Sequence, residues 1–203
     1  KQTLADIKDS AKSVGKELNL ILAGKVFNTK DKNYDPLKAD RARAESIKSL
    51  PVLDMFEQLE GLEGTDKYAE GLAAIQEQMK GLDKVSPAFA KAVGEGNTKA
   101  IRELTANAGR FTANIDGAKD KLENMSSALK GGSAEAVLSY TSKISSMGDA
   151  ATEAGKTLGL TTDIKEKLDA RFKDAGGIDD FIENLRAIEA VDKKLANERN
   201  TAS

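Results

Sequence analysis

The apolar residues of this chain recur at alternating intervals of three and four positions in nearly every segment. A spacing that averages 3.5 residues places one stripe of side chains along one face of a helix, where it contacts a partner helix. The first such series is Leu4, Ile7, Ala11, Val14, Leu18 and Ile21. The pattern therefore predicts a first helix that ends at Gly24, before the polar stretch 28–35.

The rest of the N-terminal segment, 1–60, is also predicted to be helical. Asp35 followed by Pro36 is typical of a helix start, because the carboxylate caps free amides and proline suits the first helical position. This second helix is expected to break or kink at Pro51. A short apolar face follows at Val52, Met55, Phe56 and Leu59.

The central segment, 65–130, contains the most regular periodicity. Thr65 and Asn97 are suitable N-caps for two helices, and between them Ser86-Pro87 starts a short helix with Phe89 and Val93 on its inner face. The first of these helices presents Tyr68, Leu72, Ile75, Met79 and Leu82 on one face. A long helix is predicted over 97–130, and at 1.5 Å per residue it is about 50 Å long. Its apolar positions keep the three-and-four spacing throughout: Ile101, Leu104, Ala108, Phe111, Ile115, Ala118, Leu122, Met125 and Leu129.

The C-terminal segment, 133–203, is predicted to contain three more helices. Ser133 caps the first, after the break at Gly131 and Gly132, and its face is Val137, Ile144, Met147, Ala151, Ala154 and Leu158. Thr161 or Thr162 is expected to cap a shorter second helix. The last helix, which is expected to fray over 200–203, presents Ile178, Phe181, Leu185, Ile188 and Leu195.

These patterns predict an all-α protein, since no segment shows the two-residue alternation of a strand. The long amphipathic helices with heptad seams suit either a helical bundle or an elongated coiled-coil-like assembly, and periodicity alone leaves both open. One weak repeat, Gly-Leu at positions 61, 71 and 81, is either chance or a short duplication.

Composition restricts the chemistry. The chain of 203 residues has no Cys and no His, which removes thiolate nucleophiles, imidazole acid–base catalysis and zinc-type ligand sets. Aromatic residues are only 4% of the chain, so a ring-lined ligand pocket is not expected. We expect a protein that is not an enzyme and takes no cofactor and no small-molecule substrate, although carboxylate catalysis or a calcium site stays chemically open.

The charge is small overall and uneven along the chain. A formal net charge of −2 argues against specific nucleic-acid binding. Residues 1–50 carry 11 Lys and Arg against 7 Asp and Glu, whereas residues 51–80 carry 2 against 7. This asymmetry reflects either local solvation or an attraction between the two regions, within one chain or head to tail. No membrane-spanning segment is expected, and the start at Lys1 suggests one segment of a longer chain.

Three motifs suggest chemistry, and each has a plainer interpretation. The stretch 150–157 fits a relaxed phosphate-loop pattern with Lys156 and Thr157, but no strand precedes it. The stretch 31–35 opens like a calcium loop, yet Pro36 stands where glycine is required. The carboxylate pairs Asp179 with Asp180 and Glu60 with Glu63 lack an apolar enclosure. We therefore assign no catalytic, cofactor-binding or metal-binding residue.

The chain as a whole resembles phage tail tape-measure proteins. The resemblance rests on 81–93 and 133–160, where Ala, Gly, Ser and charged residues are interleaved with a sparse Leu, Ile and Met seam. It implies a long helical protein that packs in several copies inside the tail tube, sets tail length and leaves with the genome. The chain departs from that family in being far shorter, with neither a hydrophobic membrane-inserting stretch nor a muralytic module.

The resemblance leads to the first of three hypotheses. In this first hypothesis the chain is a structural virion segment in the tail lumen, assembled in the host cytoplasm. Its partners are copies of itself and other tail proteins. The second is a bacterial helical-bundle interaction module, such as a secreted effector or a surface-adhesin domain. The third is a nucleotide hydrolase that acts through Lys156 and Thr157.

Overall fold

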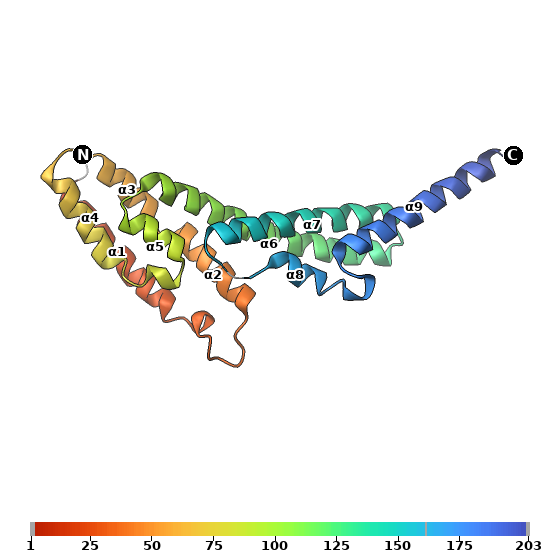
Figure 1. Ribbon diagram of the computed structural model, residues 1–203, viewed down its shortest axis with the longest axis horizontal. Coiled ribbons are helices and arrows are strands. Elements are labelled where there is room, and N and C mark those ends of the chain that lie inside the picture. Colours follow the sequence, from red (N-terminus) through yellow and green to blue (C-terminus); the bar gives the residue numbers. More distant parts are fainter. Residues whose placement is uncertain (1–2, 161, 202–203) are drawn as a thin grey trace. The chain divides into compact units, whose positions relative to one another are not determined.

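The computed structural model describes residues 3–160 and 162–201, and all regular structure in these residues is helical, as predicted (Figure 1). The α-helices are α1 Leu4–Leu22, α2 Pro36–Ser49, α3 Val52–Glu60, α4 Asp66–Gln78, α5 Pro87–Gly94, α6 Thr98–Lys130, α7 Ala134–Thr157, α8 Ile164–Asp169 and α9 Ile178–Thr201. Short 3-10 turns are η1 Lys25–Phe27, η2 Leu82–Lys84 and η3 Lys173–Ala175. None of the described helices is both long enough and apolar enough for a transmembrane span.

The helices form two compact units. Unit 1 contains the described residues up to Thr112 together with Glu153–Thr162. Unit 2 contains Ala113–Thr152 and the described residues from Asp163 onward. Because α6 and α7 each contribute to both units, the units divide the chain differently from the three consecutive segments inferred from sequence.

Three predicted N-caps, Asp35, Asn97 and Ser133, make the expected contact, and Ser86, which was predicted only to start a short helix, makes the same contact. The Asp35 carboxylate accepts a hydrogen bond from the amide of Leu37 at 2.9 Å, in front of Pro36. Ser86, Asn97 and Ser133 do the same at the starts of α5, α6 and α7: their side-chain oxygens accept from the amides of Phe89, Ala100 and Ala136. Each satisfies an amide that the first helical turn leaves without an intrahelical partner.

Two predicted caps differ from the structure. Thr65 precedes α4, but its hydroxyl donates to the carbonyl oxygen of Leu62 at 2.7 Å instead of capping the helix. The cap of α8 is neither Thr161 nor Thr162. It is Asp163, whose carboxylate accepts from the amide of Glu166 at 3.0 Å. Asp is as good a cap as Thr, and here it lies closer to the first apolar residue, Ile164. The conformation of Thr161 itself lies outside the described residues.

The core of unit 1 follows the predicted seams. Ile7, Ala11, Val14 and Leu18 of α1 are buried, and α1 packs against α3 and α4. The largest fully buried side chains are Phe56, Phe89 and Phe111, from α3, α5 and α6. Each buried Phe contributes on the order of 1.5–3 kcal/mol relative to an exposed one. These three phenylalanines are therefore a main contribution to the stability of unit 1.

Gly71 has a different role from the other two glycines of the ten-residue repeat. It is buried inside α4, where a Cβ atom would come within 2.7 Å of the Leu59 side chain. Gly61 is the C-cap of α3, and Gly81 takes a left-handed conformation with a φ of 93° before η2. The repeat in sequence is therefore not a repeat in structure.

In unit 2, α6 and α7 fold back on each other. Gly132 takes a left-handed φ of 71° between them. The hydroxyl of Thr141 lies 3.2 Å from the sulfur of Met125, and Gly117 lies against Met147. From the first pair to the second, the residue number falls from 125 to 117 in α6 and rises from 141 to 147 in α7. The two helices are therefore antiparallel here.

Two apolar positions of the predicted seams are exposed in the structure. Leu129, the last seam position of α6, is 52% exposed, and Ile188 of α9 is 53% exposed. The prediction that these two side chains lie on buried faces is wrong. α9 continues through Thr201, so helix persists over the first part of the stretch expected to fray. Residues 202 and 203 and the side chain of Leu195 lie outside the described residues.

Candidate functional site

The phosphate-loop-like stretch 150–157 lies inside α7. Its backbone amides are those of a regular helix and are bonded within it, so they cannot wrap around phosphates. Lys156 is exposed, and the Thr157 hydroxyl donates to the carbonyl oxygen of Glu153 at 3.2 Å. The stretch contributes to a helix seam, through Ala151 and Ala154, as the plainer interpretation expected.

The calcium-loop-like stretch 31–35 is a turn. The carboxylate of Asp31 accepts from the amide of Asn33 at 2.8 Å, and its carbonyl oxygen accepts from the amide of Tyr34 at 2.9 Å. Asp35 is used as the cap of α2. Among the described residues, no group of three or more acidic side chains is placed to hold a metal ion.

The two carboxylate pairs are not brought together as acid–base dyads. Glu60 and Glu63 are both exposed at the end of α3, where they join the turn that leads to α4. Asp179 and Asp180 lie in the first turn of α9. Asp179 turns toward a lysine, which no motif in the sequence had indicated.

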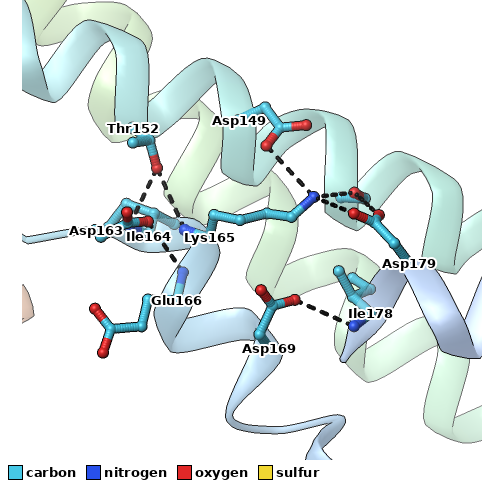
Figure 2. A network of polar contacts seen from close by, with 10 residues as sticks. Asp149, Thr152, Asp163, Ile164, Lys165, Glu166, Asp169, Ile178 and Asp179 are labelled. Carbon is cyan, nitrogen blue, oxygen red and sulfur yellow. Dashed lines mark hydrogen bonds and ion pairs between the residues drawn. The ribbon is translucent and has the colours of Figure 1, made fainter. Parts of the chain in front are cut away.

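That lysine, Lys165 of α8, is the centre of a polar network in unit 2 (Figure 2). Its ammonium nitrogen lies 2.9 Å from the Asp179 carboxylate and 3.5 Å from that of Asp149. It also donates to the hydroxyl oxygen of Ser145 at 3.1 Å, and this hydroxyl donates to Asp179 at 3.0 Å. The network connects α7, α8 and α9. We call it the Lys165 network.

The backbone around the Lys165 network is fixed by caps that cross between helices. Thr152 of α7 accepts through its hydroxyl oxygen from the amides of Ile164 and Lys165, at the start of α8 (Figure 2). Asp169 at the end of α8 accepts from the amide of Ile178, the first residue of α9, at 3.1 Å. The start of α8 is thus held by a side chain of α7, and the start of α9 is held by a side chain of α8.

Close approach of α7 and α8 depends on a glycine. Gly148 is buried, and the Leu168 side chain occupies the space where a Cβ atom at position 148 would stand. Leu168 is 6% exposed. The sequence seam included Met147 but not Gly148, because a residue without a side chain gives no hydrophobic signal.

The electrostatics of the Lys165 network favour the charged forms. Partial burial acts to lower the pKa of Lys165, but the hydrogen bond to Asp179 and the charge of Asp149 outweigh it, so the pKa is raised. The hydrogen bond from Lys165 holds the pKa of Asp179 below its usual range, helped by Ser145. A lysine with a raised pKa stays protonated near neutral pH, and a protonated amine is neither a nucleophile nor a base.

An open groove of about 450 Å³ borders the network. Its lining is mostly polar: Ser142, Ser145, Ser146, Asp149, Asp179, Ile182, Glu183 and Arg186. The charged groups that line it are partly neutralised by Lys165. The arrangement therefore joins helices, and its chemistry is that of a structural ion-pair cluster.

A second polar cluster, in unit 1, centres on Asp40 of α2. Asp40 is 1% exposed, and its carboxylate lies 2.6 Å from the guanidinium of Arg43. It also accepts from the amide of Thr162 at 2.9 Å, which connects α2 to the segment after α7. Arg43 donates to the carbonyl oxygen of Lys84 at 3.4 Å and lies over the Phe27 ring. The signal in the sequence was a carboxylate beside Ala39 and Ala44 on the buried face of α2.

One ion pair within the chain joins the basic region 1–50 to the acidic region 51–80. It is formed by Lys8 of α1 and Glu70 of α4. Both side chains are exposed, so the pair contributes little, on the order of 0.2–1 kcal/mol.

These features define an all-α protein of two helical units whose polar clusters connect helices. Compared with protein-family models, with curated proteins and with solved structures, the chain shows no match.

Proposed function

We propose that this chain is a structural, non-catalytic segment of a phage virion protein of the tape-measure type. It acts through helix–helix contacts with copies of itself and with surrounding tail proteins, in the tail lumen. The observation that supports this most is that apolar seams continue beyond their partners inside the chain. Leu129 and Ile188 both belong to seams and are both about half exposed, at 52% and 53%.

The seams have the strength that such a role needs. Ala11, Ala108 and Ala151 are fully buried seam positions, and each contributes a single methyl group. At about 0.8 kcal/mol per buried methylene-sized group, contacts of this kind are individually weak. We expect contacts between copies to be of the same weak kind, so that many together hold an assembly and none alone prevents the helices from separating when the tail releases its contents.

The polar clusters are consistent with the same role. The Lys165 network and the Asp40 cluster join helix ends by hydrogen bonds and ion pairs, and neither presents a group activated for catalysis. In a tape-measure protein, tail length is proportional to the number of helical residues, because each residue adds about 1.5 Å. α6 and α7 supply such residues, and this role requires them to lie in line in the tail instead of folding back on each other as they do in the isolated chain.

The test is an in-frame deletion in the genome that encodes this chain. Removing residues 98–157 deletes 60 residues. If the chain sets tail length as an extended helix, this deletion shortens the particle tail by about 90 Å. Alanine substitutions of the exposed Lys119 and Glu123 in the same segment change the surface but not the length of the chain, so tails should keep their parental length. Deletion variants with tails of parental length contradict the proposal.

A second candidate is a bacterial helical-bundle interaction module, secreted or on the cell surface. The observation in its favour is the self-contained core of unit 1, with Phe56, Phe89 and Phe111 fully buried. Such a module sediments as a compact monomer. A segment of the tape-measure type sediments as an elongated or oligomeric species.

A further inference from the structure

A pocket of about 230 Å³ lies in unit 1, beside the Asp40 cluster. It is bordered by α2 and the turn before it, by η2 with the start of α5, and by the segment that follows α7. Asp40 and Arg43, the ion pair of the cluster, both line it. Pockets for drug-sized molecules measure about 300–1,000 Å³, so this pocket suits a smaller ligand.

Arg43 is held on two sides and keeps free hydrogen-bond donors. Its Nη1 group lies 2.6 Å from the Asp40 carboxylate, and its Nε group donates to the carbonyl oxygen of Lys84 at 3.4 Å. The Nη2 group, which carries further N–H donors, has no partner among the described residues. Because the Arg43 side chain is only 18% exposed, an unmade hydrogen bond here is costly. The pocket therefore favours a ligand with an oxygen acceptor for Nη2.

The charges at the pocket restrict the ligand further. Asp40 neutralises Arg43, and two exposed lining residues, Asp83 and Lys84, carry opposite charges. The pocket is therefore neutral before a ligand binds, which disfavours a phosphate group with its charge of about −2. A zwitterion satisfies both signs, because its carboxylate pairs with Arg43 and Lys84 while its ammonium group pairs with Asp83.

The remaining lining is largely aliphatic. Val85, Pro87 and Leu160 contribute apolar side chains. Gly159, which has a left-handed φ of 73°, contributes backbone without a side chain. An aliphatic group of the ligand can therefore lie in the same pocket as its charged end.

We propose that this pocket binds a free aliphatic α-amino acid. Arg43 and Lys84 bind its carboxylate, and Asp83 binds its ammonium group. Asp40 acts through Arg43, because it holds the guanidinium beside the pocket. The site goes beyond the proposed structural function and does not depend on it, since every residue involved belongs to unit 1.

L-Leucine is the probe, added to the full chain in a titration that follows the backbone amide resonances by nuclear magnetic resonance. The amides of Lys84, Val85 and Leu160 should shift in a saturable way. Two leucine analogues test the two charged contacts separately. Leucinamide lacks the carboxylate and 4-methylpentanoate lacks the ammonium group, so each should bind at least about tenfold more weakly than leucine.

Substitutions of exposed side chains assign the contacts without disturbing the core. Lys84→Gln should weaken leucine binding about threefold or more, because it removes one charge that faces the carboxylate. Asp83→Asn should weaken leucine binding to a similar extent. It should strengthen the binding of 4-methylpentanoate, because it removes a negative charge that repels a bare carboxylate. The matched control is Lys80→Gln, an exposed lysine outside the pocket, which should leave leucine binding unchanged.

Arg43→Lys tests the buried donor. It keeps a positive charge beside Asp40 but loses the Nη2 group, so leucine should bind at least about tenfold more weakly. If this variant does not fold, Lys84→Gln and Asp83→Asn still decide the assignment.

Three results would overturn the proposal. The first is the lack of saturable shifts at the pocket up to the solubility limit of leucine. The second is equal binding of leucine and leucinamide, or equal leucine binding by the parent chain, Lys84→Gln and Asp83→Asn. The third is tighter binding of inorganic phosphate than of leucine, which would contradict the charge argument.

Discussion

Gly15 of α1 lies so close to Gln78 of α4 that a Cβ atom at position 15 would stand 2.9 Å from the Gln78 backbone oxygen. It would also stand 3.1 Å from the Gln78 Cβ atom. A backbone oxygen cannot rotate away as a side chain can, so the two helices must separate to admit a methyl group. The packing of α1 on α4 therefore depends on a residue that adds nothing to the apolar seam.

Gly15→Ala is expected to destabilise unit 1. Alanine favours helix by about 1 kcal/mol over glycine, but overpacking at a backbone contact costs about 1–3 kcal/mol and outweighs it. Urea unfolding followed by far-ultraviolet circular dichroism measures the change. The control is Gly109→Ala in α6, where nothing lies within 4 Å of the added atom. This variant should be stabilised by about 0.5–1 kcal/mol, and a stabilised Gly15→Ala would contradict the close contact.

Asp40→Ala is expected to be among the most destabilising substitutions of a polar residue in unit 1. It leaves the mostly buried Arg43 guanidinium and the Thr162 amide without their partner, which costs about 2–4 kcal/mol. Glu45→Ala removes one member of the exposed Glu45–Lys48 ion pair in the same helix and should cost less than about 0.5 kcal/mol. Similar losses for the two variants, measured by urea unfolding, would show that the Asp40 cluster stabilises little.

The two serine caps should differ in strength. Ser86 is fully buried, and its hydroxyl accepts from the amide of Phe89 and donates to the carbonyl oxygen of Leu158 at 2.6 Å. Ser86→Ala loses both contacts and should cost about 2–3 kcal/mol. Ser133 is exposed, with a single amide contact at 3.3 Å, so Ser133→Ala should cost about 0.5–1 kcal/mol. Thermal unfolding in parallel checks the order, and the reverse order would count against the buried contact to Leu158.

The Lys165 network should stabilise the α8–α9 region across a defined pH range. The pKa of Asp179 is lowered in the folded chain, so its contribution is present above about pH 3.9, the ordinary carboxyl value, and is lost as the pH falls through the lowered pKa. The pKa of Lys165 is raised, so its contribution is complete below about pH 10.4 and is lost as the pH rises past the raised value.

Asp179→Asn should therefore weaken the α8–α9 region at pH 7 and make no difference once Asp179 is protonated in acid. Because the Asp179 side chain is 66% exposed, the loss at neutral pH is expected to stay below about 1 kcal/mol. Hydrogen exchange of peptides from α8 and α9 localises the effect. Asp180→Asn, which changes the neighbouring carboxylate outside the network, is the control. A difference between parent and Asp179→Asn that persists in acid where the Asp179 carboxyl is fully protonated would contradict this account.

Sequence patterns predicted the elements that depend on local chemistry. Asp35, Asn97 and Ser133 are caps because each precedes an apolar series, and both signals are readable without a fold. Contacts between helices were not readable in the same way. Gly15, Gly71 and Gly148 mark close approaches between helices, yet a glycine in a helix looks like a defect until the neighbouring helix is in place.

The polar clusters escaped prediction for a related reason. Lys165 and Asp149 are 16 positions apart on different helices, and charged residues on a helix are usually solvent-exposed. Only Asp40 offered a local sign, as a carboxylate on an otherwise small and apolar face. The exposure of Ile188 was missed because periodicity shows which face of a helix is apolar, not whether another element of the same chain covers that face.

The central claim is that the exposed seams associate with other copies of the chain. Sedimentation equilibrium of the parent chain and of Ile188→Asp, over about a hundredfold range of concentration, tests it most directly. The account predicts that the average mass of the parent rises above 21.6 kDa with concentration, while the variant stays at the monomer mass. A parent chain that remains a 21.6 kDa monomer throughout, indistinguishable from the variant, would contradict it.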